Sequence, residues 1–117
     1  MSERADGDFL RDMQEAVRRI RAYTEAMAYD QLLTDIKTQD AVIRNLEIVG
    51  EAAKNISTQL SSKYPNIPWK GMAGVRDGLI HHYFGVNLDI VWNIVTVELP
   101  SLESQVKEIL QNELNGG

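Results

Sequence analysis

A helical pattern runs through the stretch VIRNLEIVGEAAKNISTQL, which spans residues 42–60. Apolar side chains return there every three or four residues, the spacing of one helix face, at Val42, Leu46, Val49, Ala53, Ile56 and Leu60. Ile43, Gly50 and Ala52 widen this face toward a second side. A helix that is apolar on more than one side must be buried against two neighbours, or against another subunit. The pattern predicts one long helix from about residue 37 to residue 62.

Amphipathic helices are also predicted before and after this central one. The first runs from about Asp8 to Met27, with apolar side chains stepping by three and four residues from Leu10 onward. The last begins at Asn87, a residue type that caps helix N-termini. Its apolar side chains recur at heptad spacing, at Leu88, Trp92, Val95, Leu99, Leu102, Val106 and Ile109. Pro100 lies inside this pattern without shifting its register, so we expect one helix that is kinked near Pro100.

Shorter segments join these helices. Residues 29–35 read as a connector with one helical turn, and the prolines in the stretch 63–69 end the central helix. Gly71 and Gly74 are expected to redirect the chain after a short turn at residues 69–73, before a helix at residues 75–83 that Gly85 caps. The predicted architecture is therefore an all-α bundle of four principal helices with short connecting helical turns.

The composition sets limits on the class of protein. The chain has 117 residues and no cysteine, which excludes disulfides and cysteine-based metal sites and fits a reducing cytoplasm. No apolar run approaches the ~20 residues of a membrane span, so a soluble, cytoplasmic location without a membrane partner is expected. The net charge of −5 argues against a protein that coats nucleic acid through a broad basic surface. A single domain over residues 1–117 is expected, with frayed ends at about 1–6 and 115–117.

One short stretch, residues 76–84, gathers the groups capable of chemistry. It contains Arg76, Asp77, His81, His82 and Tyr83, and it holds both histidines of the chain. Histidine titrates near neutral pH and moves protons, whereas arginine can hold a phosphate through two parallel hydrogen bonds. Together they suit metal-independent cleavage of a phosphodiester by a ribose 2′-hydroxyl, with His81 as general base or acid and Arg76 stabilising the phosphate.

Two other interpretations of these residues stay open. Arg76 could pair with Glu47 or Glu51 of the central helix while the histidines and Tyr83 serve the core. A metal site is the poorer alternative, because adjacent histidines on a helix point about 100° apart and no pair of carboxylates at helical spacing completes a site. The arginines of the first helix form either a solvated face or a surface that binds nucleic acid or a partner. They are Arg4, Arg11, Arg18, Arg19 and Arg21.

The order Arg76, four residues, His81, one residue, Tyr83 resembles the R-x4-H-x-Y motif of the HEPN superfamily, and of its HepT branch in particular. Three further stretches resemble that branch. They are the central-helix segment at residues 44–52, the turn at residues 64–69, and the segment at residues 83–92. The likeness covers almost the whole chain.

This resemblance implies a helical HEPN dimer that acts as the toxin of a type VII toxin–antitoxin pair. It implies a metal-independent endoribonuclease without a cofactor, with Arg76 and His81 as catalytic residues in a cleft at the homodimer interface. Asp77, at a position where the family often has asparagine, and Tyr83 are supporting residues. The implied antitoxin partner is an MntA-type nucleotidyltransferase that attaches AMP to Tyr83. The alternative is a catalytically weak HEPN protein that only binds such a nucleotidyltransferase.

Overall fold

Helices account for all the regular structure in the described residues. The computed structural model describes residues 5–81 and 86–115, and at residues 76–81, 114 and 115 it describes the backbone alone. The elements are α1 (Asp6–Thr24), α2 (Tyr29–Thr34), α3 (Ile36–Asn55), α4 (Thr58–Lys63), α5 (Trp69–His81), α6 (Leu88–Asn93), the π-helical turn η2 (Ile94–Glu98) and α7 (Leu99–Asn115). The predicted all-α fold is confirmed. Its four principal helices are α1, α3, α5 and the continuous run from α6 through η2 to α7.

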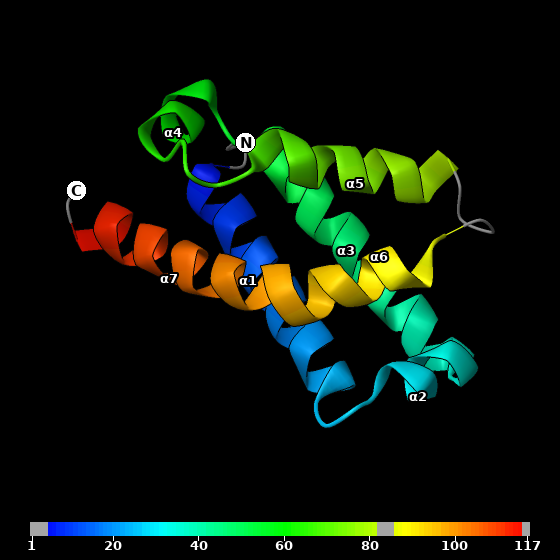
Figure 1. Cartoon of the computed structure of the whole chain (residues 1–117). Coiled ribbons are helices and arrows are strands. Elements are labelled where there is room, and N and C mark those ends of the chain that lie inside the picture. Colours follow the sequence, from blue (N-terminus) through cyan, green and yellow to red (C-terminus); the bar gives the residue numbers. More distant parts are fainter. Residues whose placement is uncertain (1–4, 82–85, 116–117) are drawn as a thin grey trace.

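The central helix α3 has a neighbour on each of two sides. It packs along most of its length against α1 and against α5, while α1 also contacts α7. Figure 1 shows α6 and α7 following one another as one long rod across the front of the bundle, with α5 above it. The short helices α2 and α4 lie at the periphery. The prediction from the two-sided apolar pattern of α3, burial against two neighbours, is therefore confirmed.

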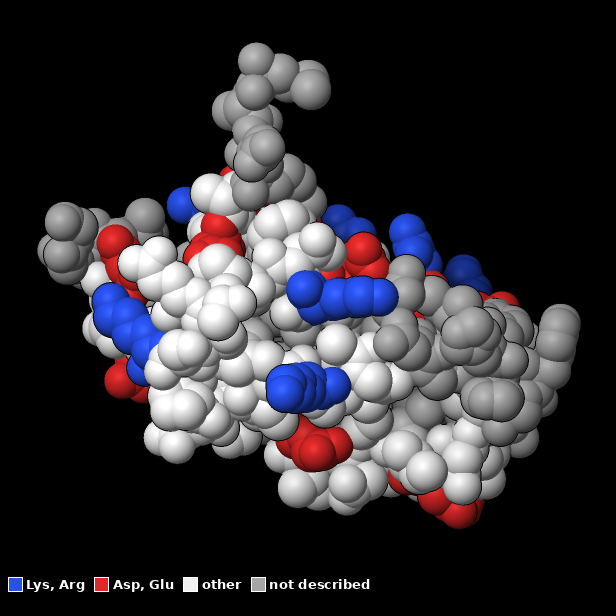
Figure 2. Space-filling view, turned by 90° about the horizontal axis from the view of Figure 1, so that it is seen from above, with Lys and Arg blue, Asp and Glu red and all other residues white. Residues whose placement is uncertain are grey.

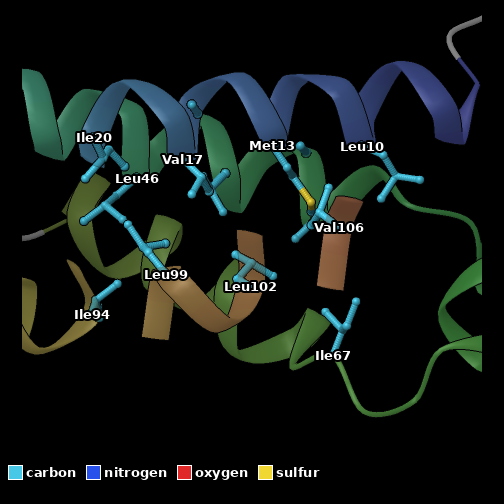
Figure 3. Packing of buried hydrophobic residues seen from close by; sticks show 14 of the residues in the cluster. Leu10, Met13, Val17, Ile20, Leu46, Ile67, Ile94, Leu99, Leu102 and Val106 are labelled. Atoms are coloured by element: carbon cyan, nitrogen blue, oxygen red, sulfur yellow. The ribbon is translucent and has the colours of Figure 1, made fainter. Parts of the chain in front are cut away.

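The core is one continuous cluster built from the predicted helix faces. Leu10, Met13, Val17 and Ile20 of α1 are at most 1% exposed, and they point toward side chains of α3, η2 and α7 (Figure 3). Burying each such side chain contributes about 1.5–3 kcal/mol relative to exposure. The heptad positions of α7 from Leu99 to Ile109 belong to the same cluster. The alternating four- and three-residue spacing thus identified the core-facing sides of these helices.

The predicted long helix at residues 37–62 is wrong in one respect, because it is two helices. α3 ends at Asn55, and Ile56 has extended backbone angles (φ −65°, ψ 136°). Ser57 then caps α4, its hydroxyl accepting a hydrogen bond from the Leu60 N–H at 3.1 Å. Leu60 is still buried in the core, at 5% exposure. The apolar spacing continues across the break and therefore does not reveal it. Ser57 does indicate the break, because serine is a residue type that begins helices.

The predicted redirection at Gly71 and Gly74 is also wrong. Both glycines lie inside α5, which runs without a break from Trp69 to His81. The described glycine residues all have ordinary negative φ angles, so neither glycine uses its access to left-handed backbone. The motif residues from Arg76 to His81 therefore belong to a longer helix than predicted. The predicted C-cap, Gly85, lies outside the described residues.

The irregularity predicted near Pro100 is present as a π-helical turn. In η2 the Leu99 N–H donates to the carbonyl of Ile94, five residues earlier. A proline has no N–H to donate to the preceding turn, and the wider turn lies immediately before it. The helix continues on both sides with its apolar positions still buried. None of the helices within the described residues is long and apolar enough to cross a membrane.

Candidate functional site

The motif occupies the C-terminal half of α5 and the residues that follow it. Arg76, Asp77 and His81 have helical backbone, and His81 is the last residue of the helix. His82 and Tyr83 lie outside the described residues, as do the side-chain positions of the other three. Their assignment as catalytic and supporting residues therefore stays a prediction. The structure does establish that Arg76 and His81 are positions on one unbroken helix.

That helix fixes how the two backbone positions relate. Five residues along an α-helix give a rise of ~7.5 Å and a rotation of ~140°. Arg76 and His81 are therefore not stacked one above the other, as residues four apart would be. A substrate phosphate held at one position would have to be reached by a flexible side chain from the other, or from a second chain.

The first turn of α5 is firmly anchored. The indole N–H of Trp69 donates to the Tyr64 carbonyl at 3.0 Å, and Trp69 is 9% exposed. Ile67 is 4% exposed and lies just before the helix. The Met72 N–H donates to the Pro68 carbonyl at 3.0 Å, which closes the first turn. These contacts, together with the packing on α3, hold the helix that carries the motif in one orientation.

An apolar cleft runs beside α5. It has a volume of about 470 Å³ and lies between α5 and the η2–α7 segment, with Leu46 and Val49 of α3 at its base. Val75, the residue before Arg76, lines it. At the opposite wall Val97 is 62% exposed. The cleft thus places an uncovered apolar surface directly beside the motif helix.

The start of α6, just beyond the motif, is held by two sets of hydrogen bonds. The Asn87 side chain accepts from the N–H groups of Asp89 and Ile90, as predicted for the helix cap. The Tyr29 hydroxyl of α2 donates to the Asp89 carboxylate. This hydrogen bond raises the pKa of the Tyr29 phenol. The Tyr29 ring also lies 5.9 Å from the Trp92 ring, centroid to centroid.

Among the residues whose side chains are described, the basic ones do not merge into one surface near α5. Seen from above that helix, they stand apart with uncharged surface between them across the middle of the view (Figure 2). On α1, Arg18 and Arg19 both pair with Glu15, and the hydrogen bond from Arg18 lowers the pKa of Glu15 to about 2. Arg11 lies 3.5 Å from Asp8. Arg11, Arg18 and Arg19 therefore form a solvated face with local ion pairs, whereas Arg21 pairs with Glu103 of α7.

The competing interpretations are only partly tested. Glu47 pairs with Arg44 at 3.6 Å, and the Glu51 carboxylate accepts from Asn55 at 3.3 Å. The side chain of Arg76 lies outside the described residues, so its pairing with Glu47 or Glu51 stays a prediction. Among the described residues no three histidine or carboxylate groups come together as a metal site would require. The expectation of a site without metal or cofactor stays a prediction, because the side chains of both histidines lie outside the described residues.

Two features near the site were not predicted. The Tyr29–Asp89 hydrogen bond joins residues sixty positions apart, and no local pattern signals such a pair. A second cleft lies on the other side of η2, lined by Trp92 and Arg21 among others. One signal for this cleft was present in the sequence, the aromatic Trp92 in an otherwise aliphatic heptad pattern.

Comparison with known proteins points to one family. The family model described as "Ribonuclease HepT-like" matches residues 13–109. An RNase-named protein of Methanocaldococcus jannaschii is 48% identical over 104 residues, covering 89% of this chain and 86% of its own. A protein of Thermococcus cleftensis that carries the name ribonuclease HepT is 43% identical over 107 residues, covering 92% and 97%. No solved structure matches the chain.

Proposed function

Because the chain belongs to the HepT-like ribonuclease family, we propose that it is an endoribonuclease whose catalytic residues are Arg76 and His81. The observation that carries this proposal is the position of both residues on one unbroken helix, α5, beside an uncovered cleft. The family assignment and the residue types point to the same activity. Metal-independent RNA cleavage requires a group that transfers protons and a cation that holds the phosphate, and a histidine and an arginine supply them.

The proposed reaction is a transesterification within the RNA. A ribose 2′-hydroxyl oxygen attacks the adjacent phosphorus, the bond from phosphorus to the 5′ oxygen breaks, and a 2′,3′-cyclic phosphate forms. One group must take the 2′ proton and another must protonate the departing 5′ oxygen. His81 serves one of these roles, and Arg76 stabilises the negative charge on the pentacoordinate phosphate. A second histidine from another copy of the chain would serve the other role.

We place the dimer interface on α5 and η2. α3 packs against α1 and α5, and its Leu46 and Val49 reach the cleft. Val97 is 62% exposed at the cleft wall. In a two-fold dimer the same patch packs on itself, so the exposed Lys70 of α5 could meet Glu98 of the other copy. This arrangement would bring two motif helices together.

A charge placed in that interface tests it. Val97→Glu should give a monomer by light scattering at micromolar concentration and should lose RNA cleavage. Ile36→Glu is the matched control, because Ile36 is 69% exposed on α3 and does not line the cleft. Dimers that persist in Val97→Glu would place the interface elsewhere.

Cleavage itself is tested by three alanine variants. His81→Ala should lower the cleavage rate of single-stranded RNA by roughly 10²–10⁴-fold, the usual contribution of a proton-transfer group. Arg76→Ala should lower it by roughly 10²–10³-fold, the usual cost of removing one group that stabilises transition-state charge. His82→Ala, the same change one residue away, should keep near wild-type activity. A chelator should have no effect. Wild type and His81→Ala that are equally inert on all RNA tried would overturn the proposal.

Regulation by a nucleotidyltransferase forms part of the proposal. An MntA-type antitoxin would transfer AMP to the Tyr83 hydroxyl, with release of pyrophosphate from ATP. The added phosphate and nucleoside would place negative charge and bulk near the substrate phosphate. Incubation with such an enzyme and ATP should add AMP mass in wild type and none in Tyr83→Phe. Addition that persists in Tyr83→Phe would put the acceptor elsewhere.

The second candidate function is a catalytically weak partner of a nucleotidyltransferase. The net charge of −5 and the separated basic side chains favour it, because RNA binding usually draws on a basic surface (Figure 2). It predicts a stable complex with the transferase, no RNA cleavage, and no growth arrest when the chain is expressed alone. The enzyme proposal predicts cleavage and growth arrest, each lost in His81→Ala.

A further inference from the structure

A second cleft lies on the side of the η2 segment that faces away from α5. It has a volume of about 440 Å³, within the range of small-molecule sites. It is formed by the end of α1 with the turn that follows, and by the α6–η2–α7 rod. The residues that give it its chemical character are Arg21, Glu25, Met27, Trp92, Thr96 and Pro100.

The π-helical turn separates this cleft from the one beside α5. Val97 and Glu98 of η2 line the α5 cleft, whereas Val95 and Thr96 line the second. π-helical turns interrupt α-helices frequently at functional sites. A partner copy seated on the α5 cleft would leave the second cleft open, because the two clefts use different residues of η2. The second cleft is therefore available to a ligand in the proposed dimer.

An aromatic ring forms one wall of this cleft. Trp92 is half-buried and lines it. The Trp92 and Tyr29 rings lie 5.9 Å apart, centroid to centroid, with an angle of 44° between their planes. Tyr29 is in turn held by its hydrogen bond to Asp89. An indole ring fixed in this way offers a rigid flat surface, and stacking of a nucleobase on such a surface contributes to single-strand RNA binding in many proteins. Met27 and Pro100 supply further apolar lining.

The polar groups of the cleft are mainly hydrogen-bond acceptors. The Thr96 hydroxyl donates to the Trp92 carbonyl at 2.8 Å, so its proton is engaged and its lone pairs remain. The Thr24 hydroxyl likewise donates to the Ile20 carbonyl, at 2.9 Å. Glu25 is exposed, and no described residue pairs with its carboxylate. A ligand that fits must therefore be flat and must present hydrogen-bond donors.

One cationic group stands at the edge of the cleft. Arg21 is half-exposed and pairs with Glu103 of α7, which holds its guanidinium beside the opening. An arginine has five N–H donors, so donors remain for a phosphate or ribose oxygen outside the cleft. The acidic partner limits the local positive charge, and recognition would therefore come mainly from the base.

We infer that this cleft is a subsite for a nucleobase bearing an exocyclic amino group, which stacks on Trp92 and donates to the Glu25 carboxylate. Cytosine, adenine and guanine carry such a group, and uracil does not. The subsite rests on the proposed function, because it would hold one base of the RNA while the motif cleaves elsewhere. Trp92 belongs to α6, the helix that follows the motif in the chain, and it is four residues from the start of that helix, a rise of ~6 Å.

Binding of mononucleotides tests the inference without any cleavage. The chain has two tryptophans, Trp92 in the cleft and Trp69 in the core. In ¹⁵N-labelled full-length protein their indole N–H signals are assigned with Trp92→Phe. Titration with CMP should shift the Trp92 signal and leave the Trp69 signal in place. UMP should bind about ten-fold more weakly than CMP, the effect of one lost base-specific contact.

Glu25→Gln provides the decisive variant, since an amide accepts from cytosine and also donates to uracil. It should bring CMP and UMP affinities together, whereas Glu108→Gln, the same change on the exposed side of α7 and outside both clefts, should keep the wild-type ratio. Equal binding of CMP and UMP by wild type, or an unmoved Trp92 signal at about 10 mM CMP, a concentration above weak millimolar affinities, would overturn the subsite. RNA cleavage without such binding would reject the subsite alone. Binding without cleavage would reject the proposed ribonuclease alone.

Discussion

The Asp6 carboxylate accepts two hydrogen bonds from Ser57, one from its N–H at 2.8 Å and one from its hydroxyl at 2.5 Å. Asp6 is the first residue of α1, and Ser57 is the N-cap of α4. The pair joins the beginning of the chain to the point where the central apolar pattern breaks. It provides a physical reason for the break between α3 and α4, because Ser57 must leave the helix to reach Asp6.

Removing this carboxylate should destabilise the protein. We expect Asp6→Ala to lower the free energy of unfolding by about 1 kcal/mol, the usual contribution of a partly exposed, charge-assisted hydrogen bond. Urea denaturation followed by circular dichroism gives the value.

A double-mutant cycle with Ser57→Ala assigns that loss to the pair. The two single changes should cost more together than the double change does, which reveals a coupling between contacting residues. Strict additivity of the two single effects would mean that the carboxylate acts on something other than Ser57.

Gly74 offers a stabilising substitution. It lies inside α5, and a methyl group added there would meet no atom within 4 Å. Because glycine in a helix costs about 0.5–1 kcal/mol relative to alanine, Gly74→Ala should raise the free energy of unfolding by that amount. Denaturation of wild type and variant under the same conditions provides the comparison. A loss of stability would show that another chain covers Gly74.

Periodicity predicted most of the fold for a clear physical reason. The core takes one face of each long helix, so residues such as Leu46 and Val106 had to recur at helical spacing. The same signal failed at Ile56 and Ser57, where the chain bends while the next apolar residue, Leu60, still enters the core. It also failed at the glycines of α5, because packing on α3 overrides their weak helix preference.

The candidate site was predictable only in part. The motif spacing singled out Arg76 and His81, and their role stays a prediction, because the family comparison identifies the family and not the site residues. Neighbouring surfaces could not be derived from spacing alone, because the cleft beside Val75 combines residues of α3, α5, η2 and α7. The Tyr29–Asp89 contact likewise depends on how α2 meets α6. Such features depend on how separate helices pack together, and this packing cannot be derived from the spacing of residues in a single sequence.

The Tyr29–Asp89 hydrogen bond should make stability depend on alkaline pH. The bond raises the pKa of the folded phenol above its unfolded value of about 10. Its contribution to stability is therefore fully present below about pH 10 and is lost as pH rises through the folded pKa. Asp89→Asn should flatten this alkaline decline, measured as unfolding free energy from about pH 9 to about pH 11.

A control for that measurement is Tyr23→Phe. Tyr23 is 42% exposed, and its hydroxyl makes no hydrogen bond with a described residue. This variant should keep the alkaline decline of the wild type. An Asp89→Asn curve that parallels wild type would show that the Tyr29 phenol does not depend on this carboxylate.

Asp77 should limit the rate of the proposed ribonuclease. It follows Arg76 on α5, and we expect its negative charge to repel the phosphate that Arg76 is proposed to hold. Replacing it by asparagine removes that charge at nearly constant size, and a repulsion of about 0.2–1 kcal/mol, typical of exposed charges, corresponds to roughly 1.4- to five-fold in rate. We therefore expect Asp77→Asn to cleave RNA that much faster at low salt and to lose the advantage as salt screens the charge. Glu108→Gln, the same loss of charge on the exposed side of α7, should leave the rate unchanged. A slower Asp77→Asn would instead give the carboxylate a positive role, such as orienting His81 or Arg76.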